Sequence, residues 1–360
     1  MRNLSKLVAT FIFVIFLSFT LNSEAAAKSV NKSQLNLMNL PEWQVATADV
    51  GGTLLFSDSP EIVGEDGILY SDTVQGKTRL LYYHLNATKS PKKIVAVLEN
   101  TSDQDVDITI SNYAFGEPSK DYLYVGKSTQ EEYFKNKNIG FAHVPAHGKR
   151  LLSAKLDKVV VNPEELVYGV FDFNATVPLK VTMLMLPVNE NPLVFVDHAK
   201  VLAADKSRLR GTFTGMDRIM KSEKVYDGKK DGAVAITLAD GALDRYRTGI
   251  DATDGSIVEN YGNYGILYKI SIPTKGLGKT KYYLNPRGGV YAGAVNIKKA
   301  LNAQGEMIAT PLNKAFFGEN NSVMDLTYLG EYDNFNQLMI EFSPPGASNL
   351  PARLILQPKD

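Results

Sequence analysis

Apolar residues recur at every second position over many short segments of this chain. The clearest cases are DVDITIS at residues 105–111, PLKVTMLML at 178–186 and YGILYKISI at 264–272. A period of two places the apolar side chains on one side of an extended strand and the polar ones on the other. KKIVAVLEN and ELVYGVFDF add β-branched and aromatic residues and end in polar turn formers. The pattern predicts an all-β protein of β-sandwich type, Ig-like or jelly-roll-like.

Few segments have a helical pattern. Ser128 and Glu131 stand three residues apart, as in a capping box, in a stretch without Gly or Pro, which predicts a short helix there. A second short helix is expected in NIKKALNA at residues 296–303. The polar stretch NTSDQD at residues 100–105 separates two strand-like runs and predicts a hairpin connection.

The chain begins with the three parts of a secretory signal peptide. Arg2 and Lys6 precede an apolar run at residues 7–21, and small residues follow, so cleavage is expected after Ala27. The apolar run is shorter than the roughly 20 residues that a membrane-spanning helix needs, which leaves an uncleaved anchor as the alternative. The prediction is a protein secreted or held at the cell surface, with a flexible leader at residues 28–40.

The remaining length exceeds the size at which one core usually divides into two. We therefore expect two β-sandwich-like domains with a few short helices, one at residues 41–200 and one at 205–360. The junction falls in the segment 189–211. The end of the chain predicts two strands joined by a loop at residues 344–351, which is rich in Pro and Gly.

Composition narrows the classes of partner. The chain has no cysteine, so neither disulfides nor thiolate metal sites can stabilise it. Basic and acidic residues number 39 each, which gives no general excess of positive charge for phosphate binding and argues against nucleic acid as a partner. No other apolar stretch approaches membrane length, so we expect no membrane span after removal of the signal.

Acidic residues beside glycine suggest one weak metal site. Asp251, Asp254 and Glu259 lie close together in DATDGSIVE, and calcium prefers several carboxylate oxygens. Their spacing matches no standard calcium loop, so ordinary Asp-Gly turns are the alternative. No cofactor other than this calcium is expected.

Tyrosine is the abundant side chain with binding potential, and it often occurs in pairs. Tyr122 with Tyr124 and Tyr282 with Tyr283 are the candidate ligand-binding residues. A tyrosine ring offers a flat apolar face and a polar tip, which suits contact with sugars or with a protein partner. Neighbouring residues of a strand face opposite ways, however, so core packing of one member of each adjacent pair is the alternative.

Motifs for catalysis are missing from the sequence. The chain contains neither a G-x-S-x-G nucleophile elbow nor an H-E-x-x-H helix. No catalytic residue is therefore predicted, and an enzyme is the less favoured class.

One stretch carries a resemblance to a known group. EDGILYSDTVQGKTRLLYYHLNATKSPKKIVAVLENTSDQDVDITI, with DYLYVGKSTQEEYF and YGNYGILYKISIP, resembles uncharacterised exported cell-envelope proteins of Gram-positive-type bacteria. In such proteins a β-rich region can lie beside repeats named for the N-terminal domain of copper amine oxidases. The resemblance implies an envelope location and no reaction. Ala114 follows Thr109, Asn112 and Tyr113 where amine oxidases have an acid after the cofactor tyrosine, which argues against that activity.

These observations lead to one main functional hypothesis and two alternatives. The main hypothesis is a noncatalytic secreted or cell-surface protein that binds a cell-wall glycan or an envelope protein. The first alternative is a hydrolase of extracellular polysaccharide whose carboxylates meet only in the folded chain. The second is a purely structural module of the envelope.

Overall fold

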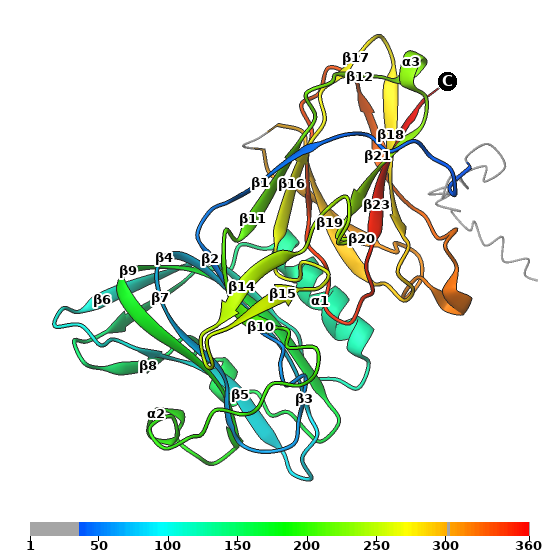
Figure 1. The fold of residues 1–360 in the computed structure, drawn as a ribbon. Coiled ribbons are helices and arrows are strands. Elements are labelled where there is room, and N and C mark those ends of the chain that lie inside the picture. The colour runs from blue at the N-terminus through cyan, green and yellow to red at the C-terminus, as the bar shows by residue number, and fades with distance from the viewer. Residues whose placement is uncertain (1–35, 301–302, 360) are drawn as a thin grey trace, which may run out of the picture. The chain divides into compact units, whose positions relative to one another are not determined.

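Strands dominate the computed structural model, which describes residues 36–300 and 303–359 and confirms the expected all-β, sandwich-like class (Figure 1). The chain from Leu37 onward forms the unit considered below. The predicted signal peptide at residues 1–27 lies outside the described residues, as does most of the predicted leader. Within the described end of that leader, Leu37 is buried and its carbonyl accepts a hydrogen bond from Arg287.

The largest sheet has eleven strands. Eight lie in the spatial order β15 (Ser256–Asn260), β14 (Arg247–Asp251), β10 (Arg210–Thr214), β2 (Thr53–Ser57), β4 (Gly67–Asn86), β9 (Leu166–Pro187), β5 (Lys92–Glu99) and β8 (Lys149–Leu151). Three more join from the side: β3 (Ile62–Val63), β6 (Val106–Phe115) and β7 (Gly140–Val144). Strands from both sides of the expected junction at residues 200–205 therefore share this sheet.

The long strand β9 organises this sheet. One edge of β9 pairs along most of its length with β4, while the other edge pairs with β6 through residues 169–175 and with β5 through residues 180–187. The expected hairpin at residues 100–105 is therefore wrong, because β5 and β6 pair with β9 rather than with each other. Local polarity marked the turn correctly, but the partner strand lies more than fifty residues further along the chain.

The central strands are buried on both faces, as their near-continuous apolar sequences require. Leu55 and Leu80 face a first core enclosed by the curled sheet itself. Leu54, Leu81 and Tyr83 face the opposite way, into a second core shared with the later part of the chain. Each face of β2 and β4 thus serves a different core.

Three smaller sheets consist of strands from the later part of the chain, except for β1, the first strand of the six-stranded sheet. That sheet has the order β1 (Ala46–Val50), β11 (Asp217–Lys221), β16 (Leu267–Ser271), β22 (Met339–Phe342), β19 (Gly293–Lys298) and β20 (Glu306–Thr310). The four-stranded sheet has the order β13 (Val234–Leu238), β23 (Ala352–Pro358), β18 (Lys279–Pro286) and β21 (Thr327–Asp333). The two-stranded sheet pairs β12 (Tyr226–Asp227) with β17 (Thr274–Lys275). The two strands predicted around the loop at 344–351 are β22 and β23.

The helix expected at residues 296–303 is wrong, because strand β19 occupies its first half. Asn296 and Lys298 both donate hydrogen bonds across the sheet to the carboxylate of Glu341 on β22. Pairing on both edges of a buried strand outweighs the local helix propensity of this segment.

Helix α1 (Tyr122–Lys135) confirms the predicted helix but begins earlier than expected. Its N-cap is Asp121, whose carboxylate accepts a hydrogen bond from the backbone of Tyr124 at 3.0 Å, and Ser128 lies in the middle of the helix. The remaining helical turns are short: α2 (Pro192–Phe195), α3 (Gly228–Asp231) and the 3₁₀ turns Leu156–Lys158 and Glu319–Asn321. Over the described ranges, none of these helices has the length and apolar character that crossing a membrane requires.

Candidate functional site

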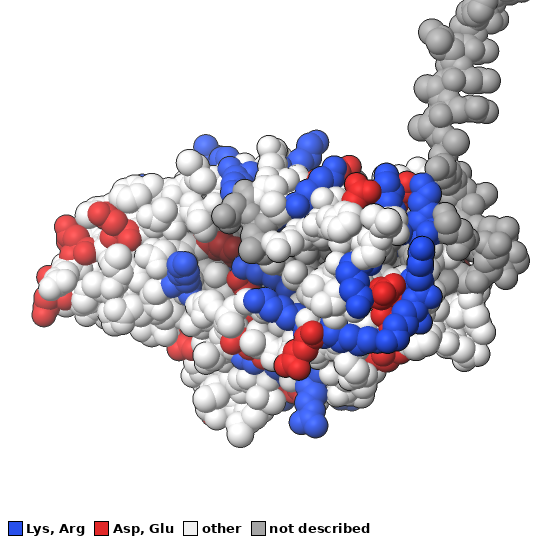
Figure 2. Space-filling view, turned by 90° about the horizontal axis from the view of Figure 1, so that it is seen from above, with Lys and Arg blue, Asp and Glu red and all other residues white. Residues whose placement is uncertain are grey.

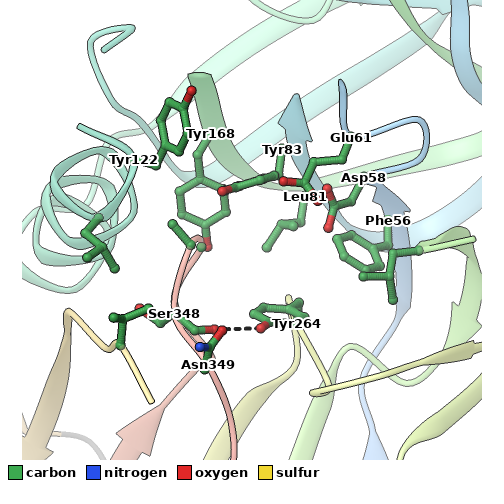
Figure 3. A pocket seen from close by; sticks show the side chains of 15 residues that line it. Phe56, Asp58, Glu61, Leu81, Tyr83, Tyr122, Tyr168, Tyr264, Ser348 and Asn349 are labelled. Atoms are coloured by element: carbon green, nitrogen blue, oxygen red, sulfur yellow. Dashed lines mark hydrogen bonds between the residues drawn. The ribbon is translucent and has the colours of Figure 1, made fainter. Parts of the chain in front are cut away.

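A cavity of about 400 Å³ lies between the second-core face of β2, β4 and β9, helix α1 and the loop that joins β22 to β23 (Figure 3). Five aromatic side chains line it, and we call it the aromatic pocket. Its volume lies in the range of roughly 300–1,000 Å³ that small-ligand sites occupy. The five rings are those of Phe56, Tyr83, Tyr122, Tyr168 and Tyr264.

The rings reach the pocket from different elements. Phe56, Tyr83 and Tyr168 project from β2, β4 and β9, whereas Tyr122 lies in the first turn of α1 and Tyr264 in the turn before β16. Phe56 stacks on Tyr264 with ring centroids 6.4 Å apart, and Tyr83 meets Tyr168 edge-on at 6.1 Å. Such contacts hold the rings in place. Phe56, Tyr83 and Tyr168 are buried, whereas the rings of Tyr122 and Tyr264 are partly accessible.

Two carboxyl groups complete one side of the pocket. Asp58 and Glu61 follow the end of β2, and Figure 3 places both on the side opposite Ser348 and Asn349. Asp58 is only 8% exposed, and its buried Oδ1 atom has no hydrogen-bond partner within residues 36–300 and 303–359. Burial, followed by the nearby charges of Glu61 and Asp205, raises the pKa of Asp58 well above its usual range. Burial and Asp205 also raise the pKa of Glu61.

The segment that carries these acids is held by Asp205. Its carboxylate accepts hydrogen bonds from the Ser59 hydroxyl at 3.0 Å and from the Glu61 backbone at 2.9 Å. It also accepts hydrogen bonds from the backbone amides of Ser207 and Arg208, both at 3.0 Å. Asp205 is thus fully used as a structural acceptor, and its charge adds to the negative potential around Asp58.

His84 fixes the same segment from the other side. Its Nδ1 lies 2.9 Å from the carbonyl oxygen of Pro60, which can only accept, so Nδ1 carries the proton and donates. The unprotonated Nε2 then accepts from the Ser57 hydroxyl at 2.9 Å. Burial is the main cause that lowers the pKa of His84 to about 4, so the ring is neutral at pH 7.

The opposite wall depends on the small size of glycine. A Cβ atom on Gly126 of α1 would lie 2.0 Å from the carbonyl oxygen of Gly346, so only glycine lets the helix approach the loop this closely. The Tyr264 hydroxyl donates to the carbonyl oxygen of Ser348 at 2.6 Å and ties that loop to the turn before β16. Both walls are therefore positioned by fixed contacts.

A second group of buried charges lies further along β4 and β9. Arg79 forms a bidentate ion pair with Asp172, with distances of 2.7 and 2.8 Å, and a further bond to Asp217 at 3.3 Å. Tyr133 donates to Asp172, and Lys269 pairs with Asp217 at 2.5 Å. The remaining donors of Arg79 reach the backbone carbonyl oxygens of Met216 and Gly265 and the hydroxyl of Tyr133. Every charge in this cluster has an opposite partner.

The four tyrosines singled out from the sequence have different surroundings. Tyr122 lines the aromatic pocket, whereas Tyr124, on the same helix, is 58% exposed and borders a separate hollow. Tyr282 and Tyr283 are each 3% exposed and pack within the four-stranded sheet against Tyr332 and Tyr328. The structure thus brings only Tyr122 of this group to the pocket.

The three acids of the predicted calcium site are held by other contacts. Asp251 is fully buried and pairs with Arg210 at 2.7 Å, and Asp254 pairs with Arg208 at 2.6 Å. Glu259 lies on β15, half-exposed. No group of three or more His, Cys, Asp or Glu side chains suited to a metal ion occurs in the described part of the chain. Calcium binding here stays a prediction. In this structure Arg210 and Arg208 provide the positive charges beside Asp251 and Asp254.

The sequence interpretation did not single out Asp58 or Glu61. The available signal was the segment SDSPE, in which two acids follow the buried strand TLLFS. Many exposed turns have the same composition, so the pattern alone is weak. Leu209, whose carbonyl oxygen accepts a hydrogen bond from the Asp58 backbone, and residues 346–349 line the same pocket but lie far away in sequence.

Charge on the molecular surface adds a further observation. On the face in Figure 2, basic side chains gather over one half, with acidic side chains among them. This mixture differs from the continuous basic surface that tracks a phosphate backbone. The expectation that nucleic acid is not a partner stays a prediction.

Comparisons with known proteins give no family for the chain. No protein-family model matches it, and neither does any curated protein, so the resemblance to envelope proteins with amine-oxidase-type repeats gains no support from sequence. Among solved structures it is weakly similar to the PBSX exported protein XepA, with 10% identity, a TM-score of 0.17 and coverage of 81% of this chain and 86% of that one. The coconut allergen cocosin matches at 7% identity and a TM-score of 0.13, covering 91% and 87% of the two chains.

Proposed function

We propose that this protein is a noncatalytic binding protein of the cell surface or the extracellular medium, and that it holds a glycan in the aromatic pocket. The observation that carries the proposal is the set of five aromatic rings around one cavity of about 400 Å³, beside the carboxyl groups of Asp58 and Glu61. Aromatic faces suit the apolar sides of sugar rings, and carboxyl groups suit their hydroxyls.

The concave shape favours a glycan over an envelope protein as the partner. Protein interfaces of ordinary affinity bury about 800 Å² on each partner over a broad surface. The aromatic pocket is instead a half-open hollow between a sheet, a helix and a loop. A purely structural envelope module, the other alternative, would gain no stability from the unpaired carboxyl of Asp58 in the wall of this cavity.

A polysaccharide hydrolase remains the second candidate, because two carboxyls with raised pKa values lie in an aromatic pocket. Glycosidases place their two carboxyls on either side of the scissile bond, about 5 to 10 Å apart. Asp58 and Glu61 are three residues apart in sequence and lie on one side of the pocket. This arrangement supports binding without hydrolysis.

The test is binding of the purified protein to insoluble peptidoglycan, chitin, chitosan and cellulose, followed by titration with soluble oligosaccharides. We expect Tyr122→Ala to weaken binding by about tenfold, because it removes one aromatic wall. Tyr124→Ala is the matched control, since it removes an exposed tyrosine from the same helix. Thermal unfolding of both variants checks that they fold.

Two results would contradict the proposal. The first is no retention on any of the four glycans at low salt. The second is loss of binding in Tyr124→Ala but not in Tyr122→Ala, which would move the site away from the pocket. Release of reducing ends from the bound glycan, lost in Asp58→Asn, would favour the hydrolase instead.

A further inference from the structure

The aromatic pocket has an imbalance of charge. Among the residues that the structure describes, its lining includes the carboxyls of Asp58 and Glu61 but no lysine, arginine or histidine. Asp205 is a further charge that acts on Asp58; it is also negative and already accepts four hydrogen bonds. Burial and the neighbouring acids favour the protonated form of Asp58, so a ligand that carries a positive charge would stabilise the ionised form and complete the site.

The unpartnered atom indicates the kind of cation. Asp58 Oδ1 is a buried acceptor without a donor, and a buried acceptor is stabilised when an N–H or O–H group reaches it. A quaternary ammonium has no N–H to give, whereas a primary ammonium has three. The surrounding rings add attraction for the same cation through their π faces.

The lining also argues against a bare metal ion. Hard cations such as calcium take six to eight oxygen ligands, and most of the wall here is aromatic or aliphatic. The cavity volume suits a group larger than an ion, with a flat body that fits between rings.

We propose that the pocket selects glycans that carry a free amino sugar, with the ammonium against Asp58 and the sugar ring against the aromatic walls. This inference rests on the proposed glycan-binding function and narrows its ligand. N-acetylation of the same sugar removes the charge and the ammonium donors, so an acetylated glycan is expected to bind more weakly.

The experiment compares two soluble trisaccharides by isothermal titration calorimetry, one of glucosamine and one of N-acetylglucosamine. We expect the glucosamine trimer to bind at least about tenfold more tightly, as charge-assisted contacts to a buried carboxylate are strong. Asp58→Asn should abolish this preference, because it removes the charge and keeps the side-chain shape. Tyr122→Ala should weaken both trimers by a similar factor.

Glu65→Gln is the control for Asp58→Asn, because Glu65 is an exposed acid that pairs with Lys200 outside the pocket lining, so the preference should be unchanged. A third titration with Nα-acetyl-lysine amide tests an ammonium without a sugar ring, and weak binding is expected. Tight binding of the lysine compound would overturn the inference in favour of a peptide ligand.

The outcomes separate the inference from the function on which it rests. Equal affinity for the two trimers, with both weakened by Tyr122→Ala, overturns the amino-sugar inference and leaves glycan binding in place. A preference that survives Asp58→Asn also overturns it, since the selectivity would then come from another group. Absence of binding to either trimer and to all four insoluble glycans overturns both.

Discussion

The face of β4 and β9 that meets the second core carries a neutralised charge cluster at one end and the aromatic pocket at the other. Arg79 and Tyr83 lie on the same face of β4, because they are four residues apart, and their register partners on β9 are Asp172 and Tyr168. At the Arg79 end every buried charge has an opposite partner. At the Tyr83 end the buried carboxyl of Asp58 has none. The first arrangement joins parts of the fold, and the second leaves an acceptor for a ligand.

Removal of Arg79 should have the largest effect on stability. In Arg79→Leu the buried carboxylate of Asp172 loses its cationic partner, whereas Asp217 keeps Lys269, and breaking a buried ion pair typically costs about 3–5 kcal/mol. The free energy of unfolding measured in urea should fall by this amount. The double variant Arg79→Leu with Asp172→Leu should recover part of the loss, because the stranded charge is removed as well. A loss below about 1 kcal/mol in the single variant would show that the cluster does not contribute as argued.

His84 should make the pocket segment sensitive to acid. Burial lowers the pKa of His84 to about 4, whereas an unfolded histidine titrates near 6.5. Between these values the unfolded chain binds more protons than the folded one, so this contribution to stability is present at pH 7 and is lost as the pH falls towards 4. The expected loss is about 3 kcal/mol between pH 7 and pH 4.

The measurement is urea unfolding of the protein and of His84→Gln at several pH values. The variant should be less stable at pH 7 and should show a smaller dependence on pH in this window. His147→Gln is the control, because His147 is exposed. An unchanged profile in His84→Gln would mean that His84 does not set this dependence.

The contrast between the charge cluster around Arg79 and the aromatic pocket also shows which features could be predicted from the sequence. Alternation predicted β6 most cleanly, because that strand buries one face, and it also marked β16 and β9, although β9 is buried on both faces over most of its length. It could not predict the neutralised cluster, since Arg79 meets Asp172 and Asp217 only through strand register and the packing of a second sheet. Tyr122 was identified through its ring chemistry alone.

Asp58 could not be predicted as a site residue for a different reason. The same local sequence, a strand followed by SDSPE, gives a solvated turn unless something covers it. Here Leu209 and the loop after β22 line the same cavity, and Asp205 adds charge near Asp58. These segments lie about 150 residues or more from Asp58 in the chain. Burial set by such distant contacts has no local signal.

Replacement of Asp58 should have the smallest effect on the free energy of unfolding, and it should stabilise the protein, unlike the replacements of Arg79 and His84. The raised pKa of Asp58 means that the folded chain keeps its proton to a higher pH than the unfolded chain, which releases it near pH 4. Stability from this group therefore falls as the pH rises above that value. Asp58→Asn should raise the free energy of unfolding at pH 7 by about 1 kcal/mol, and the gain should disappear below pH 4.

Asp205→Asn is the matched control for this change, because Asp205 is a neighbouring acid whose oxygens accept four hydrogen bonds. Its replacement should destabilise the protein by about 1 kcal/mol or more. Changes of opposite sign in the free energy of unfolding would show that Asp205 stabilises the fold whereas Asp58 destabilises it. Residues of binding sites often reduce stability in this way. If Asp58→Asn were also destabilising at pH 7, the carboxylate would have a stabilising role within the fold, and the contrast between the two ends of this strand pair would be wrong.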